Sequence, residues 1–229
     1  MIGGPVARPG ALIAIDGIEG SGKSTLVAGL AARLRAYGRE VVTLREPGGT
    51  QLGDRIRALL LDTEVAPAPS TEALLFIASR AELVAQHIAP ALAEGKIVLV
   101  DRFMLSTVAY QVGGRGLPED VVLASNQLAL GLLLPRISFI LDVPFEEGMR
   151  RMRERGTLDR MEREGEAFHR RVFDEFQKMI DWDWQNVHPD CGQIVRLDGM
   201  LPREEIVEEA WQNLSLFDVI EYRPVLSTQ

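Results

Sequence analysis

Residues 11–25 of the chain read Ala11-Leu12-Ile13-Ala14-Ile15-Asp16-Gly17-Ile18-Glu19-Gly20-Ser21-Gly22-Lys23-Ser24-Thr25. An apolar run typical of a strand ends at a glycine-rich turn, and the turn leads directly into a helical pattern of alanine and leucine. The turn from Gly17 to Ser24 satisfies G-x-x-x-x-G-K-[ST], the motif of phosphate-binding P-loops. A chance match would rarely lie between such a strand and such a helix, so the motif predicts a P-loop.

The residue types of this loop suit the phosphates of a nucleotide. Its glycines let successive backbone N–H groups curl around an anion, and the helix beginning near Lys23 adds its positive N-terminal end. Lys23 can reach the β- and γ-phosphates, and the hydroxyl of Ser24 can ligate Mg²⁺. The predicted nucleotide-binding residues are therefore Gly17, Ile18, Glu19, Gly20, Ser21, Gly22, Lys23, Ser24 and Thr25.

Composition limits the class of protein. The chain has 229 residues, 46% of them apolar and 25% charged, as expected for one globular domain. The net charge of -8 argues against a nucleic-acid partner, which normally needs a basic face, but it allows a nucleotide in a local cationic cleft. Residues 1–10 lack the apolar core of a signal peptide, and no run approaches membrane-spanning length. With a single cysteine, Cys191, the expected compartment is the cytoplasm.

Short apolar runs alternate with helical patterns along the chain. We expect strands over residues 11–15, 41–44, 97–100, 137–142 and 194–197. We expect helices over residues 23–37, 51–61, 71–94 with a break near 87–90, 106–111, 119–134, from 144, 166–184 and 202–214. The alternation predicts an α/β fold with a five-stranded parallel sheet flanked by helices. This single domain should span residues 11–214, between a flexible segment (1–10) and a C-terminal tail (215–229).

Three motifs directly follow predicted strands: Gly17–Thr25, Arg45–Thr50 and Asp101–Phe103. The carboxyl ends of parallel strands share one edge of the sheet, and ligands of open α/β sheets bind there. We therefore expect the three motifs to form one site.

Arginines in and near these motifs offer a second set of anion-binding groups beside the P-loop. Arg45 and Arg102 follow strands and Arg80 lies on a helix, and arginine clamps phosphate with paired hydrogen bonds. For Arg80, a surface charge exposed to water is the alternative. A second anion site favours a kinase, which holds an acceptor as well as a donor. The N-K-x-D segment with which GTPases read guanine is not found.

In combination, four motifs resemble the bacterial type of thymidylate kinase. They are the P-loop Gly17–Thr25, Arg45-Glu46-Pro47-Gly48-Gly49-Thr50, Leu75-Phe76-Ile77-Ala78-Ser79-Arg80, and Asp101-Arg102-Phe103-Met104-Leu105-Ser106-Thr107-Val108-Ala109-Tyr110-Gln111. Their order and spacing agree with that family, and the resemblance covers residues 11–214. It implies a three-layer P-loop kinase fold, transfer of a phosphoryl group from ATP to dTMP, the products ADP and dTDP, and a homodimer.

The resemblance also implies roles for single residues. Glu19 would face the deoxyribose 3′-hydroxyl, and Arg102 would clamp the acceptor phosphate. Phe76 would stack on thymine, although helical spacing alone favours a core aromatic. Arg80 would donate to a base carbonyl, Gln111 would read the base edge, and Tyr110 would exclude a ribose 2′-hydroxyl. The full set of expected acceptor contacts is Glu19, Arg45, Pro47, Phe76, Arg80, Arg102, Ser106, Tyr110 and Gln111.

Residues 150–163 are rich in arginine and resemble the mobile LID of these kinases. Some relatives carry an arginine directly after the P-loop acid, where this chain has Gly20. Cations from elsewhere must then meet the charge that develops on the transferred phosphoryl group. Arg151 and Arg155 can share one helix face, whereas Arg153 needs the backbone to bend. The expected catalytic residues are Lys23, Arg102, Arg151, Arg153 and Arg155, with Arg155 or Arg153 favoured as the cation that LID closure delivers.

ATP chemistry implies Mg²⁺. Ser24 is the expected direct ligand, and Asp101, which resembles a Walker B acid, is expected to act through water. Asp159 and Glu162 are weaker candidates and fit LID or substrate contacts better. The tight family turn at Glu46-Pro47 implies a cis peptide bond.

Two alternatives remain at the level of sequence. One is a kinase for another nucleoside monophosphate or for a deoxynucleoside, which would share the P-loop and differ in what Phe76, Arg80 and Gln111 read. The other is a P-loop ATPase acting as a switch, which would need no second arginine set. The expected partners are ATP and dTMP, without nucleic acid or membrane.

Overall fold

A computed structural model describes residues 9–156 and 158–220 of the chain. Its sheet has five parallel strands, as the sequence predicts. The strand order is β2-β3-β1-β4-β5. The strands are β1 (Ala11–Asp16), β2 (Val41–Arg45), β3 (Ile97–Asp101), β4 (Ile137–Asp142) and β5 (Ile194–Asp198). β1 lies in the middle, so the P-loop that follows it starts at the centre of the sheet edge.

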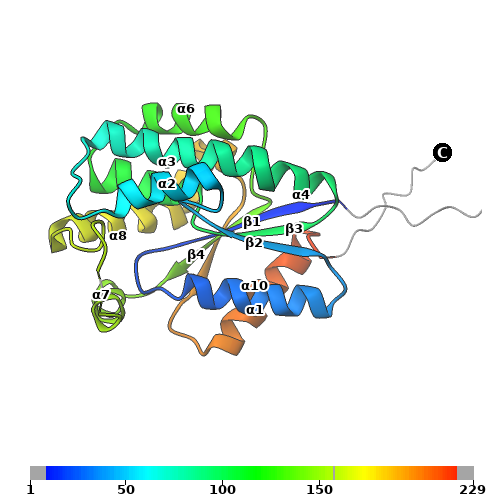
Figure 1. Ribbon diagram of the computed structural model, residues 1–229. Coiled ribbons are helices and arrows are strands. Elements are labelled where there is room, and N and C mark those ends of the chain that lie inside the picture. Colours follow the sequence, from blue (N-terminus) through cyan, green and yellow to red (C-terminus); the bar gives the residue numbers. More distant parts are fainter. Residues whose placement is uncertain (1–8, 157, 221–229) are drawn as a thin grey trace, which may run out of the picture.

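Helices cover both faces of the sheet and complete the three predicted layers (Figure 1). The α-helices are α1 (Lys23–Ala36), α2 (Gln51–Leu61), α3 (Pro69–Leu83), α4 (Ala89–Ala93), α5 (Met104–Thr107), α6 (Glu119–Leu130), α7 (Phe145–Glu154), α8 (Glu166–Ile180), α9 (Trp182–Val187) and α10 (Arg203–Leu216). Two π-helical segments, η1 (Val84–Ile88) and η2 (Val108–Gly114), and a 3₁₀ turn, η3 (Pro189–Cys191), join them.

Alternation along β1 divides the core into two halves. Ile13 and Ile15 face α1 and α10, whereas Leu12 and Ala14 face the layer that contains α3, η2 and α8. Because side chains of a strand point alternately to its two faces, a strand covered on both faces is apolar throughout. All four of these residues are buried.

The predicted helix over residues 71–94 is not broken near Pro90. It begins earlier, at Pro69, and continues through η1 into α4. Pro90 has no N–H for the regular ladder, and the turn before it widens so that Ala89 N donates to Val84 O.

The helix predicted over residues 106–111 also takes another form. It is the short α5 followed by η2, and η2 includes Gly113 and Gly114, which the sequence placed in a separating loop. A Cβ atom on Gly113 would lie 2.6 Å from Glu175 Cβ, and one on Gly114 would lie 2.5 Å from the Phe168 ring. These glycines therefore let α8 pack closely on η2.

Two further helices are shorter than predicted. α6 ends at Leu130 because Gly131 adopts a positive φ of 60°, and the residues to 134 lie outside the helix. The helix predicted over 166–184 ends at Ile180. The Asp181 side chain accepts a hydrogen bond from Asp183 N at 2.8 Å and thereby begins α9.

The described part of the predicted tail packs on the domain. α10 extends to Leu216, and Val219 and Ile220 are buried in the half of the core that contains α1. Arg39 donates to the backbone carbonyls of both residues. Residues 1–8 and 221–229, which hold most of the predicted flexible segment and tail, lie outside the described residues. Within 9–156 and 158–220, no helix combines the length and apolar character needed to cross a membrane.

Candidate active site

The predicted site residues meet in a cleft of about 1030 Å³ at the carboxyl ends of β1, β2 and β3. The C-terminal part of α7 and residues 158–163 line the cleft as well. The expected site residues that line it are Glu19, Gly20, Gly22, Lys23, Ser24, Thr25, Arg45, Pro47, Phe76, Arg80, Asp101, Arg102, Ser106, Tyr110, Gln111, Arg151 and Arg155. Gly17 and Ile18 lie behind the loop surface, and Ser21 lines a smaller neighbouring cavity.

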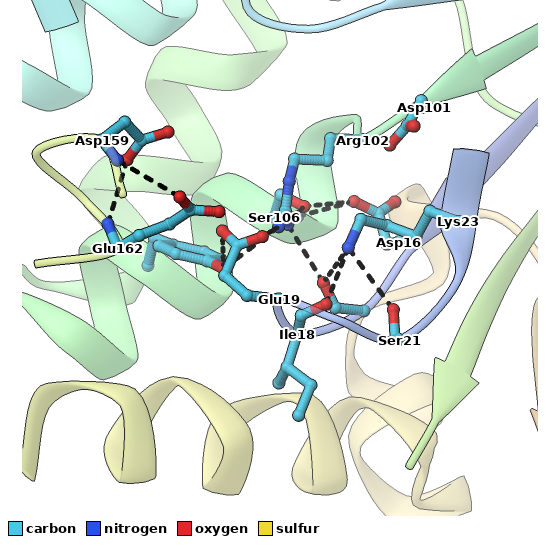
Figure 2. A network of polar contacts seen from close by, with 12 residues as sticks. Asp16, Ile18, Glu19, Ser21, Lys23, Asp101, Arg102, Ser106, Asp159 and Glu162 are labelled. Atoms are coloured by element: carbon cyan, nitrogen blue, oxygen red, sulfur yellow. Dashed lines mark hydrogen bonds and ion pairs between the residues drawn. The ribbon is translucent and has the colours of Figure 1, made fainter. Parts of the chain in front are cut away.

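Lys23 is folded into its own loop. Its ammonium donates to Ile18 O at 2.7 Å, to Gly17 O at 3.2 Å and to Ser21 Oγ at 3.4 Å (Figure 2). Burial, together with the positive charge of Arg102, lowers the pKa of Lys23 to about 8. Gly22 begins α1 in the left-handed region, at φ 100°, which suits glycine.

Ser24 and Asp101 lie together, as a shared magnesium site requires. Ser24 Oγ donates to Asp101 Oδ2 at 2.6 Å across the β1–β3 boundary. Both side chains offer hard oxygen ligands, and Mg²⁺ usually combines one or two such groups with phosphate oxygens and water. Among the described residues, no group of three acidic, histidine or cysteine side chains could hold a metal alone. The pair fits a magnesium ion that a nucleotide brings with it.

Arg102 occupies the centre of the cleft in a strained conformation. Its φ of 68° is unusual for a residue with a side chain. Its guanidinium pairs with Glu19 at 2.6 Å and donates to Tyr110 Oη at 3.2 Å and Gly17 O at 3.0 Å. The residue expected to clamp an acceptor phosphate is thus held beside the P-loop.

Asp16 holds the turn that carries Arg102, a role that sequence reasoning missed. Its Oδ1 accepts hydrogen bonds from Phe103 N at 3.0 Å, Ser106 N at 3.1 Å and Ser106 Oγ at 2.5 Å. The carboxylate is fully buried at the end of β1. The signal in the sequence is an acidic residue ending an apolar strand, where a buried charge needs several partners.

Glu19 completes the same network. Burial raises the pKa of its carboxyl, but the charges of Arg102 and Lys23 and a hydrogen bond from Tyr110 outweigh burial and hold the pKa at about 2. Glu19 is therefore ionised and pairs with the guanidinium of Arg102.

Arg80 is buried, so the alternative of a surface charge is wrong. Only 2% of this residue is exposed. Its guanidinium pairs with Glu46 at 2.6 Å, donates to Asn126 Oδ1 and lies 5.2 Å from the centre of the Phe103 ring. Glu46 and Asn126 are partners that the sequence did not reveal.

The base-reading candidates Phe76, Arg80 and Gln111 all line the cleft. Phe76 is partly exposed and lines the cleft, so it is not the core aromatic that helical spacing favours. Gln111 is buried and also lines the cleft. The Glu46-Pro47 peptide bond is cis, as expected, and Pro47 belongs to the cleft wall.

Arg57 is a cleft residue that the motifs did not single out. It lies on α2, lines the cleft and donates to Pro47 O at 3.0 Å. Burial, reinforced by the positive charge of Arg45, lowers its pKa. Two arginines that repel each other in a cleft gain from a shared anion, so Arg57 joins Arg45 as an anion-binding candidate.

Gly20 allows α7 to contact the P-loop. It has a φ of 72°, and a Cβ atom there would lie 2.4 Å from Gly148 O and 3.0 Å from Arg151 Cβ. A Cβ atom on Gly148 would in turn lie 2.4 Å from Ile18 Cδ1. Because Gly20 has no side chain, α7 lies against the P-loop and brings Arg151 next to the position after Glu19.

The three candidate arginines of residues 150–163 have different surroundings in the structure. Arg151 pairs with Glu147 at 2.6 Å and lines the cleft. Arg155, at the end of α7, pairs with Glu162 at 2.5 Å and also lines the cleft. Arg153 is exposed and lies outside the cleft lining, as its place on a continuous helix predicts.

Asp159 and Glu162 are joined to each other in a tight turn. Asp159 N donates to Glu162 Oε2 at 3.2 Å, and Glu162 N donates to Asp159 Oδ1 at 3.0 Å. Burial and the Asp159 charge raise the pKa of Glu162. Both line the cleft beside the acceptor contacts. Thr157, within the predicted LID, lies outside the described residues.

Comparisons with known proteins identify the family of this chain. The model of the thymidylate kinase family matches residues 15–189. The chain belongs to the thymidylate kinase family. Relatives include the thymidylate kinases of Chlorobium luteolum (46% identical, covering 74% of this chain and 84% of the relative) and Thermomicrobium roseum (44%, covering 89% and 93%). A third, from Pseudomonas entomophila, is 50% identical over 71% of this chain and 78% of its own length.

The lowered pKa of Lys23 predicts that nucleoside triphosphate binding weakens above pH 8. The free protein loses the ammonium proton near pH 8, and a bound polyphosphate raises the pKa again, so binding takes up a proton. Affinity should fall about tenfold between pH 7.5 and pH 9. Calorimetric titration at pH 8.5, in two buffers with different ionisation heats, measures the proton uptake.

Lys23→Arg is the matched control because a guanidinium stays protonated throughout this range. It should abolish the proton uptake. An affinity of the wild-type protein that stays constant from pH 7.5 to pH 9 would contradict the prediction.

Proposed function

We infer that the protein transfers the terminal phosphoryl group of ATP to dTMP and releases ADP and dTDP. The observation that carries this inference is that one cleft combines the P-loop with a second set of cations, Arg45, Arg57 and Arg102. A switch ATPase would need only the first. Membership of the thymidylate kinase family supports the same reaction.

The acceptor half of the cleft suits a pyrimidine deoxynucleotide. Phe76 offers a ring face to the base, and Arg80 and Gln111 offer polar groups to its edge. Arg45, Arg57 and Arg102 face the 5′-phosphate, with Pro47 and Ser106 in the surrounding wall. Glu19 and Tyr110 receive the sugar, and Tyr110 leaves no room for a 2′-hydroxyl.

The donor half contains the P-loop and a side cavity. Backbone N–H groups of residues 17–25 and Lys23 hold the phosphates of ATP. A cavity of about 180 Å³, lined by Gly22, Arg151, Gly199 and Arg203, continues from the loop toward α10 and takes the adenine. Ser24 and Asp101 would hold Mg²⁺, which would supply positive charge to offset that of the phosphates.

Arginines of α7 supply the positive charge that Gly20 does not provide. Arg155 leaves Glu162 and approaches the transferred phosphoryl group when residues 150–163 close, while Arg151 already lies against the loop. Closure also excludes water from the reacting phosphates. Arg153 reaches them only if α7 bends.

A homodimer is supported by exposed apolar side chains on neighbouring helices. α3 packs against α2 and α6, and together they form one side of the molecule (Figure 1). Leu74, Leu128 and Leu132 are 61%, 88% and 99% exposed on and next to these helices. Exposed apolar side chains that gather into a patch mark an interface, and these leucines are its proposed members. The cytoplasmic location expected from the sequence stays a prediction.

The choice of acceptor tests the proposed reaction. In a coupled assay with ATP, dTMP should give the highest kcat/KM, dUMP should follow, and dCMP, dGMP and AMP should be poor acceptors because their base edges mismatch Arg80 and Gln111. ATP hydrolysis without an acceptor should be negligible. Strong activity on another acceptor, or hydrolysis that dTMP does not stimulate, would contradict the proposal.

Alanine variants test the catalytic arginines. Arg155→Ala should lower kcat by roughly 10³-fold, because the charge on the transferred group loses a cation, with a smaller change in the KM for dTMP. Arg151→Ala and Arg153→Ala complete the series. Arg150→Ala is the matched control: Arg150 is exposed on the same helix and is paired with Glu147 and Glu154. Near-normal kcat in Arg151→Ala, Arg153→Ala and Arg155→Ala alike would refute the role of residues 150–163.

Sedimentation velocity tests the dimer. Wild-type protein should sediment as a dimer, and Leu128→Glu should sediment as a monomer because it places a charge in the apolar contact. Leu216→Glu, at a 74% exposed site on α10, should leave the dimer intact. A wild-type protein that sediments as a monomer at micromolar concentration would contradict the proposed dimer.

A further inference from the structure

Glu72 of α3 is a fully buried carboxylate beside the acceptor half of the cleft. It accepts four hydrogen bonds: from Gln111 Nε2 at 3.0 Å, from Arg115 Nε and Nη2 at 2.9 Å each, and from Arg160 Nη2 at 2.6 Å. These donors come from η2, from the residue after it, and from residues 158–163. The sequence motifs gave no indication of this cluster.

The surroundings of Glu72 keep it ionised. Burial raises its pKa, but the hydrogen bonds from Arg115 and Arg160 outweigh burial, so the pKa lies below its ordinary value. An ionised carboxylate accepts hydrogen bonds and donates none. Whatever faces Glu72 must therefore present a donor.

This requirement fixes the orientation of the Gln111 side-chain amide. An amide has an NH₂ end and a carbonyl end, and a glutamine with neutral neighbours can turn either end toward a ligand. Here the NH₂ end faces Glu72, because the reverse orientation would place the carbonyl oxygen against a carboxylate. The carbonyl oxygen, Oε1, is the end that remains for a ligand. Gln111 is only 1% exposed, lines the cleft and lies in the wall that Phe76 and Arg80 also line.

We propose that Glu72 is a specificity-determining residue, which selects the acceptor base by fixing the Gln111 carbonyl toward it. A carbonyl oxygen at this position accepts from the ring N–H of a thymine or uracil base. It repels cytosine, which has a bare ring nitrogen there. Glu72 does not touch the substrate and acts as a positioning residue through Gln111. The proposal rests on the proposed function, since it assumes a base beside Gln111.

Arg115 and Arg160 make the position of Glu72 rigid. Arg115 also pairs with Glu164 at 2.6 Å, and Arg160 also donates to Leu60 O at 2.7 Å. The carboxylate is therefore held from several elements at once and cannot turn away from Gln111. A contact that discriminates between bases needs such support.

Glu72→Gln tests the proposal. The new amide can donate or accept, so Gln111 becomes free to turn its NH₂ end toward a base. The ratio of kcat/KM for dTMP to that for dCMP should fall at least about tenfold, through a relative gain for dCMP. It should not reach one, because Arg80 still opposes the exocyclic amine of cytosine.

Glu164→Gln is the matched control. It removes the other carboxylate on Arg115 and leaves Gln111 and Glu72 untouched. Its dTMP to dCMP ratio should stay within about twofold of the wild-type ratio, whatever its stability. Thermal melts establish that both variants are folded before the kinetics are compared.

Two outcomes would overturn the proposed role of Glu72 and leave the proposed function standing. One is a folded Glu72→Gln variant with an unchanged ratio; the other is an equal fall of the ratio in Glu164→Gln. A wild-type protein that does not phosphorylate dTMP would instead overturn the proposed function, and this inference with it.

If Glu72→Gln does not fold, dTMP methylated at N3 tests, in the wild-type protein, the contact between Gln111 and the base through which Glu72 would act. This compound lacks the donor, and its inhibition constant should be at least about a hundredfold above the KM of dTMP, whereas dUMP should stay within about tenfold. Inhibition by the methylated compound as strong as that by dUMP would overturn the proposal.

Discussion

The parallel pairing of β1 with β3 is the constraint on which the rest of the site depends. The register sets Ile15 opposite Asp101, and Arg102 N donates to Ile15 O at 2.8 Å just beyond the last paired residues. Two segments that are 86 positions apart in the chain therefore end side by side. One continues into the P-loop and the other into the turn that carries Arg102, so a donor site and an acceptor site arise at a single strand boundary.

The charged groups of the cleft pair with groups of the protein itself. Lys23 binds the carbonyls of its own loop, Glu19 pairs with Arg102, and Arg155 pairs with Glu162. Under the proposed function, each of these cations exchanges a partner within the protein for a phosphate. Binding would then exchange one set of hydrogen bonds for another, and the buried ammonium of Lys23 has partners within its own loop.

The sequence predicts most of what depends on neighbouring residues. Apolar runs bounded by turns located all five strands, and the P-loop, the turn after β2 and the Asp101–Phe103 motif were placed at strand ends because each follows its strand directly. The resemblance named residues that do line the cleft, including Phe76 and Gln111.

Features that depend on distant packing could not be predicted in the same way. Burial of Arg80 requires Glu46 and Asn126 from two other segments, and the ionised Glu72 requires three separate donors. The continuous helix through Pro90 depends on a π-helical turn, for which periodicity gives no signal. The sequence did not predict the helix ends at Gly131 and Asp181, because apolar residues at helical spacing continue past both positions.

The contact between Gly20 and α7 has a consequence for how such sequences vary. A side chain at position 20 and close packing of α7 at Gly148 exclude each other, since the Cβ position of Gly20 lies 2.4 Å from Gly148 O. A chain with an arginine at position 20 must hold α7 farther from the P-loop. The arginines of α7 are then less necessary as a source of positive charge. Positions 20 and 148 should therefore covary across relatives, with the positive charge supplied from the loop or from the helix.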